Sequence, residues 1–250
     1  MLKFLNYNKS HSVKNLETFL NKRKFSQKNN TTLVKKIIYN VKKKGDKAVI
    51  DYEKKFSKIT IRSNKITFSK KEINEIAKKL DKKIKQSIDL AYNRIKKFHS
   101  EQKFFPFSFK DKYKNELSYK YSPIENVGVY VPGGTASYPS TVLMNCIPAM
   151  VAGVKNIYLT TPSLGAGVNS AVIYAAKKCG VKKIYKTGGA HSIAALAYGT
   201  ETFEKVNKIV GPGNTFVASA KKEVFGDVGI DMVAGPSERT IVAAKYANPG

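Results

Sequence analysis

The sequence of 250 residues contains no tryptophan and only two cysteines. Cys146 and Cys179 stand 33 positions apart, which matches neither a zinc-binding nor a redox spacing, so we expect reduced thiols. No apolar run approaches the roughly 18 residues that a membrane span needs. The apolar stretch within residues 1–8 is too short for a signal peptide. These absences argue against a membrane protein or a disulfide-rich secreted protein, and we expect a cytoplasmic location.

Histidine is also scarce, with three copies in the whole chain. His11 and His99 fall in a half that reads as helical, and we interpret both as structural. The sequence has no His-Glu-x-x-His pattern, no cluster with metal-ligand spacing and no Gly-x-Ser-x-Gly turn. It therefore gives no sign of a hydrolase or of a metalloenzyme whose metal ligands lie within these residues.

Negative charge is limited, because 18 acidic residues face 45 basic ones and the net charge is +27. Such a balance often indicates a nucleic-acid or anionic-membrane partner. However, 41 of the basic residues are lysine and only four are arginine, the residue on which nucleic-acid recognition relies most. We therefore favour a compositional bias at exposed positions, and nucleic acid is the less favoured partner.

Glycine is almost missing from residues 1–125, where Gly45 stands alone, whereas the remaining residues hold sixteen. The charge divides in the same way, with net +21 in the first half and +6 in the second. We therefore predict three parts: a basic, helix-rich segment of the first domain over 1–126, a Rossmann-like α/β domain over 127–237, and the first strand of an incomplete continuation over 238–250.

The first part has the apolar spacing of amphipathic helices. The first clear stripe consists of Val34, Ile37, Ile38 and Val41. Asp46 follows the glycine break, and we expect its side chain to cap a second helix. Ser69 is followed three residues later by Glu72, which predicts a capping box at the start of one long helix extending to Phe98.

Short strands are predicted over residues 66–68 and 113–121, and after residue 126 strands and helices alternate. The later strands are expected over 127–131, 157–160, 184–187, 206–210 and 230–233, followed closely by 240–244. Repeated β-α units of this kind indicate a parallel sheet. The predicted fold class is α/β: a Rossmann-like parallel sheet with helices on both faces, preceded by a helix-rich N-terminal segment.

Glycine-rich turns follow five of the predicted strands, at 131–135, 162–167, 187–190, 211–214 and 234–238. Right-handed crossovers place all of these turns at one edge of the sheet, where folds of this class bind ligands. The helix that follows such a turn presents free N–H groups and the positive end of its dipole, which favour an anion. The turns predict a nucleotide-sized anionic ligand, although the standard dinucleotide fingerprint is absent.

Three residues in these turns are candidate ligand contacts, each with a structural alternative. His191 follows a Gly-Gly-Ala turn and is either a hydrogen-bonding contact or a polar helix start. Asn214 either binds ligand or caps the helix that follows it, or does both. Ser237, next to Glu238, either binds ligand or serves the turn.

Distinctive motifs lie in and around these turns, at 127–135, 139–144, 188–190, 194–200, 211–214 and 231–238, with others at 45–46 and 95–102. Together these motifs resemble those of the histidinol dehydrogenase family. The motifs occur in the family's order and extend over nearly the whole chain. This is far more specific than any single glycine turn.

The resemblance implies a zinc-dependent, NAD-linked enzyme that oxidises L-histidinol through histidinal to L-histidine, acting as a homodimer. It implies that Tyr130 and Asn214 contact NAD and that Ser237 contacts the substrate. His191 stands where the family usually has glutamine, and it can still offer NAD one donor or acceptor.

The zinc ligands and the catalytic acid–base residues of the family lie further along the chain than Gly250. The resemblance therefore implies that residues 1–250 include no catalytic residue and no metal ligand. Two readings stay open at this point. The chain is either part of an active enzyme or a non-catalytic nucleotide-binding fragment that lacks the zinc site.

Overall fold

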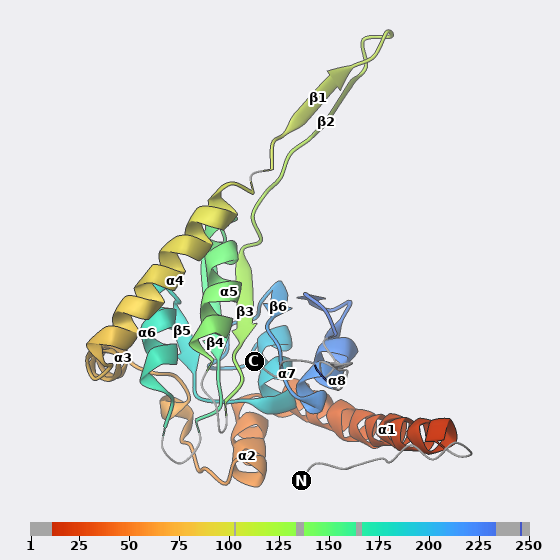
Figure 1. Cartoon of the computed structure of the whole chain (residues 1–250), viewed down its shortest axis with the longest axis vertical. Helices are drawn as coiled ribbons and strands as arrows, with labels where there is room; N and C mark the ends of the chain where they lie inside the picture. The colour runs from red at the N-terminus through yellow and green to blue at the C-terminus, as the bar shows by residue number, and fades with distance from the viewer. Residues whose placement is uncertain (1–11, 103, 134–137, 164–166, 234–245, 247–250) are drawn as a thin grey trace.

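The computed structural model describes residues 12–102, 104–133, 138–163, 167–233 and 246, and a parallel sheet of five strands forms its centre (Figure 1). The strands are β3 (Asn126–Tyr130), β4 (Asn156–Thr160), β5 (Lys183–Tyr185), β6 (Lys208–Val210) and β7 (Gly229–Ile230). Their order across the sheet is β5-β4-β3-β6-β7, and every pair is parallel. The chain therefore forms the central strand β3 first and adds β4 and β5 toward one edge of the sheet. It then crosses back and adds β6 and β7 toward the other edge.

This topology brings the carboxyl ends of all five strands to one edge of the sheet. The direction of winding reverses between β3 and β6, which is the position where doubly wound sheets bind ligands. The predicted α/β fold with a Rossmann-like parallel sheet is confirmed.

Helices cover both faces of the sheet. The helices α5 (Pro139–Val151) and α6 (Ser170–Lys178) lie on one face, where Val129 and Leu159 point into the core. The helices α7 (Gly189–Tyr198) and α8 (Thr215–Val224) lie on the other face, over Tyr130 and Ile209. Alternate residues of each strand thus serve two separate apolar cores.

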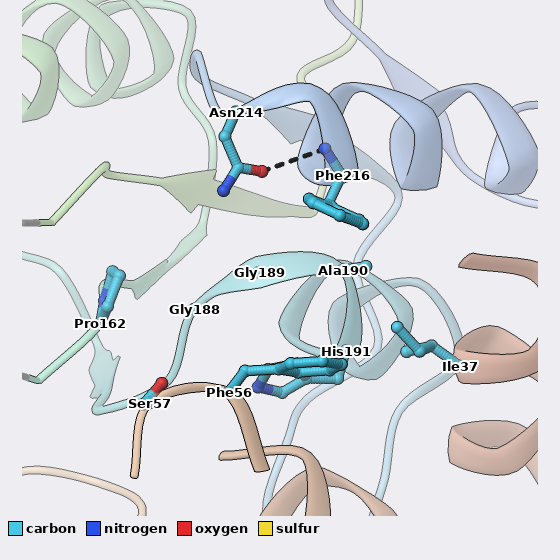
Figure 2. A pocket seen from close by; sticks show the side chains of 10 residues that line it. All are labelled: Ile37, Phe56, Ser57, Pro162, Gly188, Gly189, Ala190, His191, Asn214 and Phe216. Carbon is cyan, nitrogen blue, oxygen red and sulfur yellow. Dashed lines mark hydrogen bonds between the residues drawn. The ribbon is translucent and has the colours of Figure 1, made fainter. Parts of the chain in front are cut away.

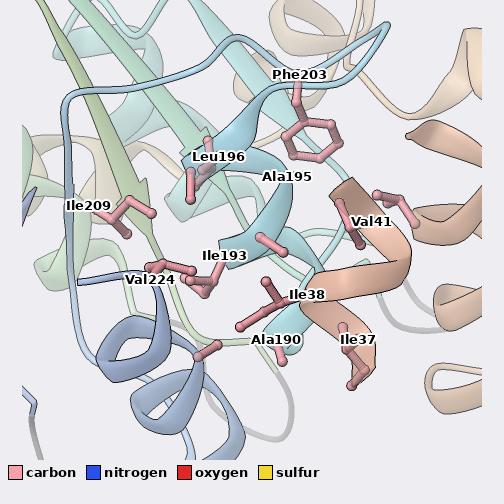
Figure 3. Packing of buried hydrophobic residues seen from close by; sticks show 14 of the residues in the cluster. Ile37, Ile38, Val41, Ala190, Ile193, Ala195, Leu196, Phe203, Ile209 and Val224 are labelled. Carbon is pink, nitrogen blue, oxygen red and sulfur yellow. The ribbon is translucent and has the colours of Figure 1, made fainter. Parts of the chain in front are cut away.

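The N-terminal helices extend both of these layers. They are α1 (Ser12–Lys44), α2 (Asp46–Phe56), α3 (Lys70–Lys78) and α4 (Lys82–Ser100), with a 3₁₀ turn at Ser63–Lys65. The pair α1 and α2 packs on α7 and α8, while α3 and α4 pack on α5 and α6. The predicted stripe of α1 is buried, and Figure 3 shows Ile37, Ile38 and Val41 facing α7. The boundaries at 126 and 237 stay predictions.

Two expectations about the helix ends were wrong. Asp46 does not cap α2, because Gly45 takes the N-cap position and the Asp46 carboxylate accepts hydrogen bonds from the hydroxyls of Thr200 and Thr202. The long helix after Ser69 is divided into α3 and α4. Asp81 accepts from the backbone N–H groups of the residues two and three positions after it, so it begins a new helix. The capping box of Ser69 and Glu72 is confirmed.

The two early strands are shorter than expected. Residues 66–68 contribute one antiparallel bridge, between Thr67 and Tyr185 at the edge of the sheet. The segment 113–121 yields β2 (Glu116–Tyr119), which pairs with β1 (Phe107–Lys110) in a hairpin that projects from the body of the molecule (Figure 1). No helix among the described residues is long and apolar enough to cross a membrane.

Candidate functional site

A cavity of about 300 Å³ lies at the carboxyl edge of the sheet, between the turns that follow β5 and β6 (Figure 2). Its lining comes from both halves of the chain: Ile37, Phe56, Ser57, Pro162, Gly188, Gly189, Ala190, His191, Asn214 and Phe216. Its position matches the edge at which the glycine-rich turns were expected to gather. We call this cavity the edge pocket.

The turn after β5 needs glycine at two successive positions. A Cβ atom on Gly188 would lie 2.4 Å from Cγ of Pro162, so a side chain at this position would collide with the turn after β4. Gly189 has a φ of +70°, a conformation that residues with a side chain rarely adopt. The two glycines therefore allow two loops to meet closely at the start of α7.

His191 lies in the first turn of α7 and forms one wall of the edge pocket. Its side chain is 3% exposed, and its ring stacks near Tyr52 and Phe56, with ring centroids 5.9 and 6.3 Å away. Figure 2 shows the imidazole lying along the ring of Phe56. The Nε2 atom is 2.9 Å from Oε1 of Glu53. His191 therefore lies at the edge of the sheet that the sequence predicted, and the structure adds an acidic partner, Glu53.

Glu53 comes from α2, and its side chain is 1% exposed. Its Oε1 atom also accepts a hydrogen bond of 2.8 Å from the backbone N–H of Gly188. Burial by itself raises the pKa of this carboxyl, but the hydrogen bonds and charge of His191, with help from Ser57 and Gly188, hold the pKa below its ordinary value. Glu53 is thus an ionised carboxylate at the start of α7.

Sequence reasoning missed Glu53, although a signal was present. Val49, Tyr52, Glu53 and Phe56 are spaced i, i+3, i+4 and i+7, so the acid stands within the inward stripe of α2. A carboxylate at such a position is buried and needs partners. The spacing by itself marks Glu53 as an unusual acid.

Tyr130, the last residue of β3, is buried behind the edge pocket and is not part of its lining. Its hydroxyl oxygen accepts a hydrogen bond of 3.1 Å from the backbone N–H of Gly189. Burial raises the pKa of this tyrosine above its ordinary value. In this structure Tyr130 supports the glycine turn that forms the pocket, and its predicted contact with NAD stays a prediction.

Asn214 lines the edge pocket and also caps α8. Its Oδ1 accepts from the backbone N–H groups of Phe216 and Val217, at 3.1 and 3.0 Å (Figure 2). Lys221, which is 2% exposed, anchors the loop before Asn214. Its Nζ donates hydrogen bonds to the carboxylate of Asp231 and to the carbonyl of Gly211. The capping role of Asn214 is confirmed, and its ligand role stays a prediction.

The protein itself occupies donors at both helix starts that border the pocket. Glu53 and Tyr130 take the N–H groups of Gly188 and Gly189, and Asn214 takes those of the first turn of α8. A phosphate at the start of α7 would meet the carboxylate of Glu53. The edge pocket is therefore better suited to an uncharged part of a nucleotide than to its phosphates.

Two further predictions concern Ser237 and a metal centre. Ser237, like its neighbour Glu238, lies outside the described residues. Within the described ranges, no group of three or more His, Cys, Asp or Glu side chains could hold a metal ion. These residues do not fit zinc, and none of them is assigned a role toward it.

Comparison with known proteins agrees with the fold. The sequence model described as histidinol dehydrogenase matches residues 20–250. A histidinol dehydrogenase of Pelagibacter ubique is 56% identical over the full chain, which covers 58% of that relative. Another, from Mesorhizobium japonicum, is 49% identical over 84% of the chain and 49% of the relative.

A solved structure gives the same result. The crystal structure of histidinol dehydrogenase from Elizabethkingia anophelis superposes with a TM-score of 0.78 at 42% identity, covering 82% of this chain and 48% of that one. The chain thus spans about half the length of the relatives that it matches. From the family match and these identities together, the chain belongs to the histidinol dehydrogenase family.

Proposed function

We propose that the edge pocket holds part of NAD and that the chain contributes the NAD-binding portion of a histidinol dehydrogenase. The observation that carries this proposal is the meeting of His191 and Asn214 in one cavity, although 23 residues separate them in sequence. Tyr130, the third candidate, supports the same cavity through Gly189. The resemblance to histidinol dehydrogenases supports NAD as the nucleotide.

The residues around the pocket can perform distinct tasks toward NAD. Phe56 and Phe216 offer flat apolar surface for a ring, while His191 and the exposed side of Asn214 offer hydrogen-bonding groups. Because Glu53 places a negative charge at the start of α7, we propose that a nucleoside portion enters the pocket and that the phosphates stay outside it. NAD, when bound, supplies the acceptor for a hydride.

The reaction of the longer relatives extends this proposal. We propose that the chain belongs to a cytoplasmic homodimer that oxidises L-histidinol to L-histidine with zinc, with Ser237 as a substrate contact. The alternative, a non-catalytic nucleotide-binding chain, predicts NAD binding without oxidation. Nothing in the described residues assigns an acid–base catalyst.

Calorimetry with NAD tests the binding proposal on the 250-residue chain. We expect saturable binding that is weakened about tenfold by Asn214→Ala, the loss expected from one or two hydrogen bonds. Asn169→Ala is a matched control, because Asn169 caps α6 in the same manner but does not line the pocket. An equal loss of NAD affinity in the two variants contradicts the proposal. The absence of NAD binding by the unsubstituted parent chain and by both variants also contradicts it.

A zinc-supplemented assay of histidinol-dependent NADH formation then separates the two readings of activity. Turnover by the purified chain excludes the non-catalytic alternative. NAD binding without turnover is the outcome that the non-catalytic alternative predicts for this chain.

A further inference from the structure

The wall of the edge pocket contains two buried ionisable groups among apolar rings. Glu53 and His191 are 138 positions apart in sequence, and their side chains are 1% and 3% exposed. Tyr52 and Phe56 cover them on the α2 side. Burying an ionised group is costly unless it is well paired, so a pair in this place calls for a role beyond packing.

The chemistry of Glu53 decides how the imidazole carries its hydrogens. An ionised carboxylate can only accept hydrogen bonds, and Oε1 already accepts from Gly188. The contact with Nε2 of His191 therefore requires a hydrogen on Nε2. In the neutral ring this leaves Nδ1 without a hydrogen, as an acceptor.

The Nδ1 atom of His191 is buried and has no hydrogen-bond partner among the residues that the structure describes. It lies on the side of the glycine turn, since a Cβ atom on Gly189 would be 3.5 Å away from it. A buried acceptor that lacks a hydrogen bond lowers the stability of the folded state. A ligand hydroxyl or amide that reaches Nδ1 through the pocket would recover that loss.

We propose that Glu53 is a positioning residue that fixes His191 with Nδ1 as the acceptor for an uncharged N–H or O–H group of the ligand. The proposal rests on the proposed NAD site, where ribose hydroxyls and the carboxamide are groups of this kind. A glutamine at this position would offer a donor and an acceptor without titrating. The Glu53–His191 pair therefore makes ligand binding depend on protonation.

Few other titratable or charged groups face this ring. Tyr52 packs on it from α2, and Tyr130 of β3 lies behind Gly189 with a pKa that burial raises. Lys55 lies over the ring of Phe56, with Nζ 5.6 Å from its centroid. The pocket residues from α1 and α8 are uncharged. Protonation of His191 would thus convert Nδ1 from an acceptor to a donor and remove the proposed contact.

The first test reads the hydrogen positions of His191 directly, by nitrogen-15 NMR of the ring in the free chain at neutral pH. We expect hydrogen on Nε2 in the parent chain and a shift toward Nδ1–H in Glu53→Gln, whose amide can donate to Nε2. Asp51→Asn, which removes an exposed carboxylate from the same helix, should leave the signal unchanged. Hydrogen on Nδ1 in the parent, or an unchanged signal in Glu53→Gln, overturns the positioning role.

The second test is a double-mutant cycle of NAD affinity by calorimetry. We expect Glu53→Gln to weaken binding about tenfold when His191 is present and less than about twofold in the His191→Gln chain. Equal losses in the two backgrounds would show that Glu53 acts on general structure, and would overturn the proposal. Absence of NAD binding in all variants, with the NMR result intact, rejects the NAD site but keeps the positioning role.

The affinity should also depend on pH in a characteristic way. In the parent chain NAD binding should weaken as the pH is lowered, because a second ring hydrogen would occupy Nδ1 and remove the acceptor. In His191→Gln the affinity should change little over the same pH series. A parent chain whose affinity does not change, or rises, as the pH falls contradicts the acceptor role of Nδ1.

Discussion

At the scale of single residues, the edge pocket depends on Gly189, where any other residue would strain the backbone. Gly189 has a positive φ, donates its N–H to Tyr130 and lies against the ring of His191. A Cβ atom here would sit 3.4 Å from Cε1 of that ring, within ordinary contact distance. Backbone conformation and pocket geometry are thus constrained at the same position.

A comparison of two glycines separates these effects. Gly189 and Gly180 have similar positive φ values, +70° and +66°. Gly189→Ala and Gly180→Ala should therefore each lose about 1 kcal/mol of unfolding free energy. A Cβ on Gly180 would touch nothing within 4 Å, so this variant should keep its NAD affinity. Gly189→Ala should weaken NAD binding several-fold. Urea denaturation and calorimetry measure the two quantities, and similar NAD affinities would show that the turn does not shape the site.

The sequence allowed some of the site residues to be predicted and concealed others. Asn214 and His191 follow glycine turns that end parallel strands, and topology alone brings such turns together. Glu53 lies on a helix whose packing partner comes 138 positions later, and no local pattern specifies that partner. Its inward position could be read from the sequence, but the imidazole that it meets could not.

At the scale of secondary-structure elements, the two-residue capping box was a reliable signal, whereas the single capping residue Asp46 and the long apolar spacing were not. The capping box of α3 formed as expected, because Ser69 and Glu72 satisfy each other's backbone N–H groups. The apolar spacing continues past residue 80, yet the chain breaks there. Asp81 caps a new helix, so that α3 packs on α6 while α4 packs on both α5 and α6. Tertiary packing overrode a continuous pattern.

Glu72 makes the stability of α3 depend on pH. Burial raises the pKa of this carboxyl, but Lys186 and the backbone and hydroxyl of Ser69 outweigh it and lower the pKa to about 2. A carboxyl with a lowered pKa adds stability above its unfolded value near 4.5 and loses it as the pH falls toward 2. Glu72→Gln should therefore unfold at a lower temperature than the parent at pH 7, and the two melting curves should converge near pH 2.

The control for this measurement is Glu75→Gln, which removes an exposed carboxylate from the same helix. Its melting temperature should follow that of the parent at every pH. A difference between Glu72→Gln and the parent that persists unchanged at low pH would mean that the loss comes from packing and not from the charge.

At the scale of the whole molecule, charge and apolar surface are distributed unevenly. Lys221 is the one buried lysine among the described residues, so the high lysine content reflects the surface, as the sequence indicated. Apolar side chains, in contrast, are exposed on one face of the projecting hairpin, where Phe107 and Phe109 pair with Tyr119 and Leu117. The overall composition gave no sign of this arm, because its strands are short and their partners are local.

The hairpin should contribute little to the stability of the chain. The double variant Phe107→Thr, Phe109→Thr should change the free energy of unfolding by less than about 0.5 kcal/mol, because both side chains are half exposed. Leu159→Ala, at a fully buried position of β4, should lose about 2–5 kcal/mol. Urea denaturation compares them, and a loss above about 1 kcal/mol in the hairpin variant would contradict the view that the arm stands apart from the core.

The long separation between Glu53 and its partners also has a consequence for how the molecule is made. The two helices α1 and α2 leave the ribosome more than a hundred residues before α7, against which they pack. Until then the carboxylate of Glu53 stays hydrated and the apolar stripes of α1 and α2 have nothing to cover them. Contacts of such high sequence separation form slowly. The edge pocket, whose lining extends to Phe216, therefore cannot be complete until most of the described chain has been synthesised.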